Sequence, residues 1–298
     1  MTFKQVDVFS ARPFEGNPVA VCLQADGLVA DDMQRIAAWT NLSETTFVLD
    51  PTVAAADYRL RIFCPRFELP FAGHPTIGSA HAALEAGLVD GAKRALVQEC
   101  GAGLIRLAVD GEGAGRRIFF EAPAARIVGD WSDRVGALEA ALGTSLAPRP
   151  APLTIAVGPV WTIVRVADAE TLLALRPDMA AVAALTTDGS GITAFALGGA
   201  DGADVTVRSF APSAGVPEDP VCGSGNAVVA AYLVHTGLLA ETGATYVAHQ
   251  GHALGRAGEV FVRVTDDGRR IAIGGAAVTT VDGRLSIEPN ARVKDQPC

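Results

Sequence analysis

The sequence predicts an α+β fold with two similar halves, each holding one apolar helix enclosed by strands. Most predicted elements are short strands, but the helical segments at residues 76–86 and about 227–236 are apolar on all sides. A helix without a polar face is buried, so strands are expected to surround it. Gly73 and Gly223 are 150 positions apart, as are Gly87 and Gly237. This spacing indicates an internal duplication.

The strand that precedes each apolar helix repeats as well, at an offset of 147 positions. This offset pairs Arg61 with Arg208, and the phenylalanine two residues after each arginine also matches. The difference of three residues falls in the loop between strand and helix. At the helix start, the alignment places Cys222 opposite Ala72.

The remaining elements follow from residue alternation and from turn residues. A hairpin around residues 6–9 and 18–23 opens the chain, and a helix with early acidic residues follows at 31–40. Pro75 fits the first position of the next helix, and Gly87 fits its C-terminal cap. Further helices are expected at 132–142 and, as one helix, at 169–185, with a last hairpin at Asp282-Gly283. Another strand runs to Leu49 and has Glu44 at its beginning. The other predicted strands are 58–65, 103–109, 116–121, 153–157, 160–166, 192–197, 205–210, 246–249, 260–264 and 271–273.

Length and composition bound the class of protein. A chain of 298 residues is expected to form two domains. The net charge of -9 argues against a nucleic-acid or anionic-membrane partner, because either would require clustered Lys and Arg. The start lacks a charged segment followed by an apolar one, and no apolar span has membrane length, so we expect a cytoplasmic protein.

The five cysteines are scattered and form no Cys-x-x-Cys motif. This usage fits a reducing compartment and predicts neither a disulfide framework nor a zinc site.

Chemistry-bearing residues gather in front of the two apolar helices. The segment 218–226 carries an acid pair, a thiol and a hydroxyl between small residues, and Gly73-His74-Pro75 opens the other helix. The free N–H groups and the dipole of a helix start attract anions such as carboxylates. The two segments are therefore predicted to form the two halves of one active site.

These segments together resemble the phenazine-biosynthesis PhzF-like family, which shares the diaminopimelate epimerase fold. The similarity covers nearly the whole chain, and the combination of segments is specific where each alone would be weak. The segments that carry it are Val6-Asp7-Val8-Phe9, Phe14-Glu15-Gly16-Asn17-Pro18, Asn41-Leu42-Ser43-Glu44-Thr45, Pro70-Phe71-Ala72-Gly73-His74-Pro75, Arg208-Ser209-Phe210-Ala211-Pro212, Glu218-Asp219-Pro220, Gly223-Ser224, Gln250-Gly251, Gly255-Arg256 and Gly274-Gly275.

The resemblance implies two pseudo-symmetric domains, each a β-barrel wrapped around a central apolar helix. With the boundary expected near Ala122-Pro123-Ala124 and a C-terminal strand that returns, the first domain is residues 1–122 plus about 276–298, and the second is 123–275. The family's signature activity moves a proton between carbons of a dihydro-hydroxyanthranilate. The resemblance further implies a homodimer, a small carboxylate-bearing substrate, no cofactor and no metal.

By the same resemblance, Glu44 is the general acid/base, and three further residues bind the substrate's polar groups and assist proton movement: His74, Asp219 and Ser224. A carboxylate in a partly dry cleft can have its pKa raised toward neutrality, which suits this role. The expected catalytic set is Glu44, His74, Asp219 and Cys222, and the expected substrate-binding set is Asn17, Gly73, His74, Gly223, Ser224 and Gly225.

Cys222 leaves alternatives open. Cys222-Gly223-Ser224-Gly225 is similar to the second thiol motif of amino-acid epimerases, which use two cysteines, but Ala72 stands at the first position. A helix start can activate a thiol, whereas a buried cysteine is often a small packing residue. A one-thiol amino- or hydroxy-acid epimerase or racemase is therefore an alternative, and a non-catalytic metabolite-binding dimer is another.

Overall fold

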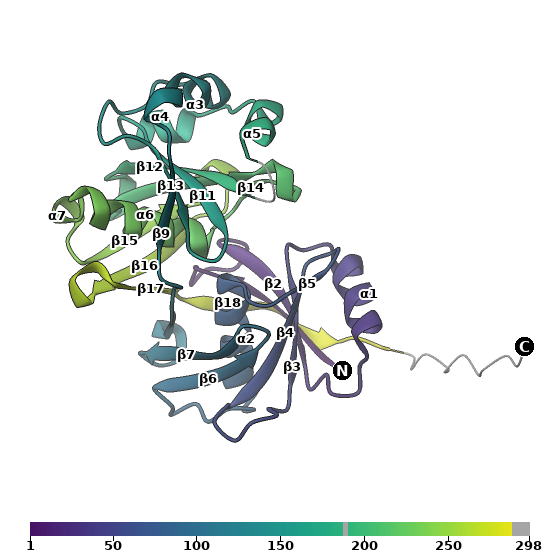
Figure 1. Cartoon of the computed structure of the whole chain (residues 1–298). Coiled ribbons are helices and arrows are strands. Elements are labelled where there is room, and N and C mark those ends of the chain that lie inside the picture. Colours follow the sequence, from purple (N-terminus) through teal and green to yellow (C-terminus); the bar gives the residue numbers. More distant parts are fainter. Residues whose placement is uncertain (187–189, 288–298) are drawn as a thin grey trace, which may run out of the picture.

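The computed structural model describes residues 1–186 and 190–287, in which 18 strands join into one continuous sheet. Figure 1 shows two lobes, one in purple and blue and one in teal and green. The strands of the N-terminal lobe are β1 (Thr2–Val8), β2 (Asn17–Leu23), β3 (Thr45–Leu49), β4 (Tyr58–Phe63), β5 (Glu68–Leu69), β6 (Ala95–Cys100), β7 (Gly103–Asp110) and β8 (Arg117–Glu121). Those of the C-terminal lobe are β9 (Arg126–Asp130), β10 (Leu153–Ala156), β11 (Val160–Arg165), β12 (Gly191–Leu197), β13 (Val205–Ala211), β14 (Val216–Asp219), β15 (Thr245–Gln250), β16 (Gly258–Thr265) and β17 (Arg270–Gly275).

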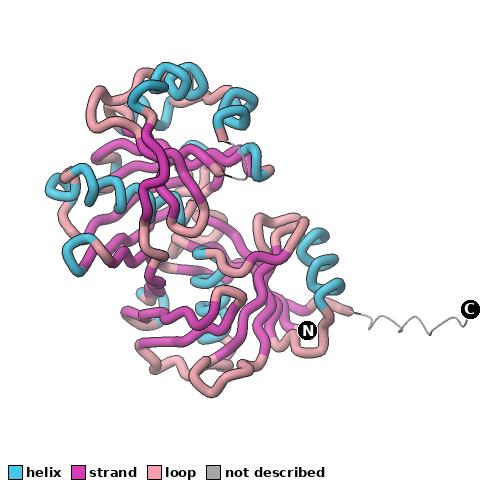
Figure 2. The backbone as a smooth tube through the Cα atoms, in the orientation of Figure 1, coloured by secondary structure: helices cyan, strands magenta, loops and turns pink. Residues whose placement is uncertain are grey.

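The helices take two kinds of position, inside the lobes and on their outer faces (Figure 2). The α-helices are α1 (Ala30–Thr40), α2 (Gly73–Glu85), α3 (Val135–Leu142), α4 (Ala169–Ala174), α5 (Met179–Leu185), α6 (Gly223–Thr236) and α7 (Leu239–Thr242). Short 3-10 turns are η1 (Gly113–Gly115), η2 (Ser132–Arg134), η3 (Ala200–Gly202), η4 (Pro212–Ala214), η5 (His252–Leu254) and η6 (Asp266–Gly268). None of the helices in residues 1–186 and 190–287 is both long and apolar enough to cross a membrane.

Strand pairing follows the same order in both lobes. In the N-terminal lobe β1–β2 is antiparallel, β2–β3 parallel, β3–β4 antiparallel, β4–β6 parallel, and β6–β7 and β7–β8 antiparallel. In the C-terminal lobe β10–β11, β11–β12, β12–β13, β13–β15, β15–β16 and β16–β17 repeat this pattern of directions. Two equivalent short strands, β5 and β14, pair with β4 and β13. The pairing thus agrees with the internal duplication that the sequence indicates.

The two apolar helices occupy equivalent positions inside the lobes. Helix α2 contacts β1, β2, β3, β4 and β8, and α6 contacts β10, β11, β12, β16 and β17. Ala72 is the N-cap of α2 and Cys222 is the N-cap of α6, so the sequence alignment holds to the residue at the helix starts. Most residues of both helices are buried, because strands surround them.

Helices α1, α3, α4 and α5 cover the outer faces of the strands. Helix α1 buries Met33 and Ala37 against Cys22, Phe47 and Phe63. Cys22 is therefore a packing residue, and burial raises the pKa of its thiol to about 12. Helices α3, α4 and α5 form a separate core on the outer face of the C-terminal lobe. Each lobe thus has an inner helix and an outer helical layer.

One strand pairing and one returning strand tie the lobes together. Strands β8 and β17 are antiparallel, and Phe120 lies opposite Ile273. After β17 the chain returns to the N-terminal lobe as β18 (Ala277–Arg284), which pairs with β1. Figure 1 shows this yellow strand among the purple and blue ones. The Phe120 ring also lies between the starts of α2 and α6, near Gly73 and Gly223.

The single helix expected at 169–185 is wrong, because the segment forms two helices, α4 and α5. Pro177 has no backbone N–H and interrupts the helical hydrogen bonds. Asp178 then starts α5 by accepting hydrogen bonds from the N–H groups of Ala180 and Ala181. Strands β5, β6, β9 and β14 were not predicted.

The hairpin expected at Asp282-Gly283 is also wrong, because both residues lie inside β18. Lys4 of β1 pairs with Asp282 across the ladder, with 2.7 Å between Nζ and Oδ2. In addition, α2 begins at Gly73, so Pro75 is its third residue and not its first. Proline is tolerated there because the N–H groups of a first turn have no intrahelical partner. The C-cap is Ala86, and Gly87 follows it with a positive φ of 70°.

Stability is expected to require glycine at position 73 but not at position 223. A Cβ at Gly73 would lie 2.6 Å from Cζ of Phe120, whereas at Gly223 the distance would be 3.6 Å. The Phe120 ring is buried against Phe71, so it has little room to move. We expect Gly73→Ala to lower the free energy of unfolding by about 1–3 kcal/mol, measured by urea denaturation. Gly223→Ala is the matched control, and equal losses for the two variants would contradict this view of the packing.

Candidate active site

The starts of α2 and α6 meet where the two lobes join. The two helices are in contact, and both have glycine as their first residue. The first intrahelical bonds run from Thr76 N to Ala72 O and from Asn226 N to Cys222 O. The N–H groups that precede them have no partner within their helix. Two helix dipoles and these N–H groups therefore make one region that favours an anion.

Glu44 and His74 face each other at this point. Glu44 directly precedes β3, and its Oε2 lies 3.4 Å from Nε2 of His74 at the start of α2. Both atoms are buried and neither has a hydrogen-bond partner. Unpaired buried polar atoms are rare in folded proteins and mark sites where a ligand or water completes the bonding.

His74 is a neutral imidazole of defined tautomer. Burial lowers its pKa to about 3, although a hydrogen bond to the backbone of Pro18 acts in the opposite direction. Proline can only accept a hydrogen bond through its carbonyl. Because Nε2 is unpaired, Nδ1 is the nitrogen that donates to Pro18. Nε2 therefore presents a lone pair toward Glu44.

Glu44 is poised to gain or lose a proton near neutral pH. Its pKa is raised to about 7, first by burial and then by the negative charge of Asp219, while a hydrogen bond from Ser43 acts in the opposite direction. When protonated, Glu44 can donate to Nε2 of His74. When ionised, it is a base in a site with little water. A carboxyl group with a pKa near the working pH suits both directions of proton transfer.

Asp219 supplies the second acid, from the C-terminal lobe. Burial raises its pKa to about 6, and hydrogen bonds from Cys222, Val221 and Asn17 oppose that shift. The Asn17 amide donates to Oδ1 of Asp219 over 2.8 Å and to the carbonyl of Val221 over 3.0 Å. An amide from β2 thus holds an acid of the other lobe in place.

Cys222 caps the start of α6. Its Sγ accepts a hydrogen bond from Gly225 N over 3.2 Å, and its own N–H donates to Oε1 of Gln250 over 3.1 Å. Burial raises the pKa of the thiol well above its ordinary value, and the charge of Asp219 adds to the effect. The group is therefore a protonated thiol and not a thiolate.

Ser224 is held by a tryptophan that the sequence did not single out. Nε1 of Trp161, on β11, donates to Oγ of Ser224 over 3.0 Å. The Ser224 hydroxyl also lies 3.4 Å from Sγ of Cys222. Ser224 therefore belongs to a short hydrogen-bonded series that continues through Cys222 to Asp219.

The structure brings most of the predicted residues to this region but gives two of them other partners. The side-chain amide nitrogen of Asn17 is occupied by Asp219 and Val221. The N–H of Gly225 is occupied by Cys222, and its Cα faces Ser209. A direct substrate contact of Asn17 or Gly225 stays a prediction.

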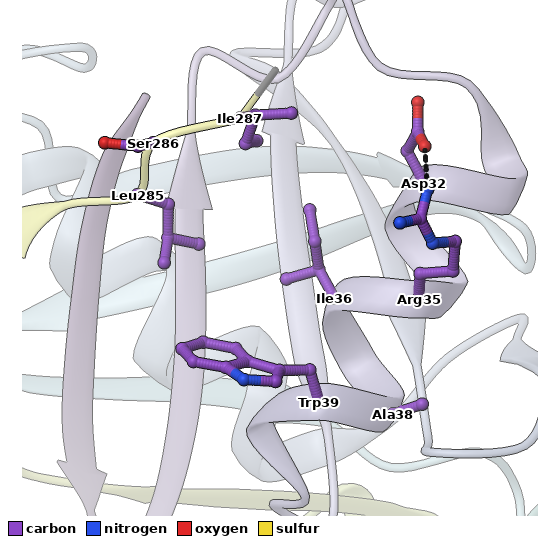
Figure 3. Close-up of a pocket in the computed structure, with 8 residues that line it drawn as sticks. All are labelled: Asp32, Arg35, Ile36, Ala38, Trp39, Leu285, Ser286 and Ile287. Atoms are coloured by element: carbon purple, nitrogen blue, oxygen red, sulfur yellow. Dashed lines mark hydrogen bonds and ion pairs between the residues drawn. The ribbon is translucent and has the colours of Figure 1, made fainter. Parts of the chain in front are cut away.

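A pocket elsewhere on the surface is of a different kind. It lies between α1 and residues 285–287, and its walls include Ile36, Trp39 and Leu285 (Figure 3). Its two charged residues, Asp32 and Arg35, form an ion pair with each other at 3.2 Å. None of the residues predicted for the active site lines this pocket. Across residues 1–186 and 190–287, no group of three or more His, Cys, Asp or Glu is placed to hold a metal ion.

A profile of phenazine biosynthesis-like proteins matches residues 6–283. The chain belongs to the phenazine biosynthesis-like family. It is an isomerase, the activity named for relatives that align with nearly the whole chain. The trans-2,3-dihydro-3-hydroxyanthranilate isomerase of Pseudomonas chlororaphis is 33% identical, with 94% of this chain and 97% of that protein aligned. Antisense-enhancing sequence 1 of Schizosaccharomyces pombe is 40% identical, over 96% of this chain and 99% of the relative.

Solved structures agree with the family membership. The PhzF-family phenazine biosynthesis protein of Bacillus anthracis superposes with a TM-score of 0.87 and 26% identity, over 96% of this chain and 99% of the other. A probable proline racemase from Agrobacterium radiobacter has a TM-score of 0.63 at 16% identity, over 98% of this chain and 94% of the other. This second likeness concerns the fold alone.

Three side chains of this phenazine biosynthesis-like isomerase were missed as parts of the site: Trp161, Asn226 and Gln250. The Gln250 amide joins Cys222 N, the Asn226 side chain and the carbonyl of Asp219. Gln250-Gly251 is among the segments that carry the family resemblance, so a signal for Gln250 existed. Trp161 lies in an ordinary apolar strand, and no local pattern marks it.

Removing the charge of Asp219 should lower the pKa of Glu44. In Asp219→Asn the like charge that favours the protonated form of Glu44 is gone, so its pKa should move down from about 7 toward its ordinary value. The measurement is a carbon-13 NMR titration of the glutamate side-chain carboxyls. Asp133→Asn, at an exposed position in η2, is the control and should leave the titration unchanged. An unaltered Glu44 titration in Asp219→Asn would show that the two acids are not coupled.

Proposed function

We propose that this isomerase moves a proton between carbons of a small carboxylate-bearing metabolite, with Glu44 as the general acid/base and without a cofactor or metal. The observation that carries the proposal is the buried Glu44, with a pKa of about 7, beside the unpaired Nε2 of a neutral His74. The reaction of the Pseudomonas chlororaphis relative, on trans-2,3-dihydro-3-hydroxyanthranilate, belongs to this class by its name. That compound is our first candidate substrate.

The substrate carboxylate is proposed to bind between the starts of α2 and α6. The N–H groups of Gly73, His74, Gly223 and Ser224 lie in the first turns of these helices and have no intrahelical partners. Such N–H groups and the helix dipoles favour an anion, and they also stabilise negative charge that develops beside it. The small residues at both starts allow close approach of the ligand.

The proton transfer balances within the substrate. Glu44, as carboxylate, takes a proton from one carbon, and the electron pair of that C–H bond moves into the substrate's adjoining π-system. Glu44 then returns the proton to a second carbon, so no oxidant or second reactant is needed. Once Glu44 has taken the proton, its carboxyl group can donate a hydrogen bond to Nε2 of His74, which orients it for the return of the proton. Asp219 and Ser224 bind polar groups of the substrate.

We propose two domains that meet at this site, residues 1–122 with about 276–298 and residues 123–275, each a barrel around its apolar helix. The repeated strand pairing and the contacts around α2 and α6 support this division. Residues 288–298 lie outside the described residues. The assembly proposed from the family resemblance is a homodimer in the cytoplasm, without nucleic-acid or membrane partners.

Replacing Glu44 should stop exchange of the substrate proton. In Glu44→Gln the site keeps its shape but loses its base, so we expect activity to fall by a factor of about 10²–10⁴. The measurement is turnover of trans-2,3-dihydro-3-hydroxyanthranilate in deuterated water, with deuterium at carbon followed by NMR. Glu241→Gln, on an exposed helix, is the matched control. Full activity of Glu44→Gln would exclude the assignment, and saturable binding without exchange in the wild type would favour a binding protein.

A second candidate is an epimerase or racemase of amino or hydroxy acids that uses Cys222 as the proton donor opposite Glu44. The protonated state of the thiol and its hydrogen bond to Asp219 favour this candidate. A donor thiol next to an acid can be reprotonated after it gives up its proton. Glu44 would then act as the base on the other face of the α-carbon.

Substitution of Cys222 separates the two candidates. The hydroxyl of Cys222→Ser can still cap α6, but its much higher intrinsic pKa makes it a poor proton donor. For the proton shift we expect less than about a threefold change in rate, and for inversion a loss of about 10²-fold or more. The measurements are polarimetry on amino and hydroxy acids and the deuterium assay above. An unchanged rate of inversion in Cys222→Ser would exclude the thiol mechanism.

A further inference from the structure

The duplicated lobes allow each active-site residue to be compared with its counterpart. Thr45 of β3 pairs with Phe63, and Ile192 of β12 pairs with Phe210 in the equivalent ladder. The residue before Thr45 is Glu44, and the residue before Ile192 is Gly191. These two positions are 147 apart, the offset that also relates the following strands. Gly191 is therefore the counterpart of the proposed acid/base.

Trp161 fills the space that a side chain at Gly191 would need. A Cβ on Gly191 would lie 2.2 Å from Cζ3 of Trp161 and 2.7 Å from the carbonyl oxygen of Phe210. In the parallel ladder of the C-terminal lobe Trp161 pairs with Gly191. In the N-terminal lobe Ala20 pairs with Thr45, so Val19, one residue earlier, is the neighbour of Glu44 and the counterpart of Trp161. In the N-terminal lobe the smaller Val19 thus lies beside the carboxylate of Glu44. In the C-terminal lobe the large ring of Trp161 lies beside Gly191, which has no side chain.

The indole N–H of Trp161 contacts the start of α6, as the Glu44 carboxyl group contacts the start of α2 in the other lobe. Ser224 is the counterpart of His74, at the offset of 150 that relates the two helices. In one lobe Oε2 of Glu44 lies 3.4 Å from Nε2 of His74, and in the other Nε1 of Trp161 donates to Oγ of Ser224 over 3.0 Å. The indole is almost fully buried, so its N–H has a defined direction.

We infer that Trp161 is a positioning residue that turns the Ser224 hydroxyl into a hydrogen-bond donor toward a carboxylate ligand at the start of α6. The inference rests on the proposed carboxylate site. An indole N–H can only donate, and a serine hydroxyl has one hydrogen to give. With Trp161 as its donor, Ser224 can direct that hydrogen to Sγ of Cys222 or to the ligand. A carboxylate is the stronger acceptor of the two.

Because of this arrangement, the two lobes also contribute different groups to the site. Each lobe supplies one acid, but at different positions: Glu44 before β3, and Asp219 where the N-terminal lobe has Leu69. Trp161 excludes a second acid at the Glu44-like position. The C-terminal lobe therefore contributes hydrogen-bond donors for the ligand at that position, while the N-terminal lobe contributes the base.

The test compares two buried tryptophans that make the same kind of bond. Nε1 of Trp131 donates to Oγ1 of Thr154 over 2.8 Å, in the outer core of the C-terminal lobe. Trp131→Phe is therefore a matched control for Trp161→Phe, since each variant keeps a ring and loses one hydrogen bond. Benzoate is the probe and benzamide is its neutral counterpart, followed by proton–nitrogen NMR of the full chain.

We expect benzoate, but not benzamide, to shift the indole N–H resonance of Trp161 and to leave that of Trp131 in place. Ser224→Ala should move the same Trp161 resonance without ligand. Loss of one directing hydrogen bond should raise the Kd for benzoate about 3- to 10-fold in Trp161→Phe and less than twofold in Trp131→Phe. Equal Kd values for the two variants, or benzamide binding as tightly as benzoate, would overturn the inference.

An activity measurement distinguishes this inference from the proposed function. With trans-2,3-dihydro-3-hydroxyanthranilate, Trp161→Phe should raise KM more than it lowers kcat, because binding is affected and Glu44 is intact. If no proton shift is found in the wild type, the proposed function fails, and the benzoate measurements still decide the role of Trp161. A fall in kcat with unchanged KM would contradict the role in ligand binding.

Discussion

The antiparallel pairing of β8 with β17 fixes how the two lobes are placed relative to each other. It joins two lobes that would otherwise be separate sheets, and it sets Phe120 opposite Ile273. The Phe120 ring then lies against the starts of both inner helices. Because α2 and α6 are each enclosed by their own strands, fixing the lobes relative to each other also fixes where the helices point. Two positive helix ends are thereby held at one place, although like ends repel each other.

The chemistry of the site depends on two buried acids and on the groups that stabilise their negative charge. Two acids, one from each lobe, are close enough for the charge of Asp219 to raise the pKa of Glu44. The helix ends favour negative charge, and hydrogen bonds from Asn17 and Val221 stabilise ionised Asp219. Glu44 lacks such donors, apart from Ser43, and its neighbour His74 is neutral. Hydrogen bonding thus differs between the two acids, and their pKa values differ as well, about 6 for Asp219 and about 7 for Glu44.

Divergence after duplication explains why equivalent positions do different work. The paired arginines show what was kept: Arg61 bonds Glu68, and Arg208 bonds Glu218, each at the base of the loop that leads to a helix start. The Arg208–Glu218 pair is buried, and the Arg208 guanidinium also donates to the carbonyls at the end of α4. The positions at the candidate site differ between the lobes instead. Glu44 and Val19 stand in one lobe where Gly191 and Trp161 stand in the other, while the backbone pairing of these strands is the same.

The repeat, the two buried helices and the small set of polar residues at their starts follow from the amino-acid sequence alone. These features are local or periodic, and the offsets place Ala72 and Cys222 at the N-caps where the structure has them. The family resemblance pointed to Glu44 and His74 as partners in function. Three contacts of the site could be seen only in the folded chain: Nε2 of His74 faces Oε2 of Glu44, Asn17 donates to Asp219, and Trp161 donates to Ser224. These contacts join residues from different strands and lobes, and their geometry depends on how the sheet twists and on how its strands are paired, which no local pattern records.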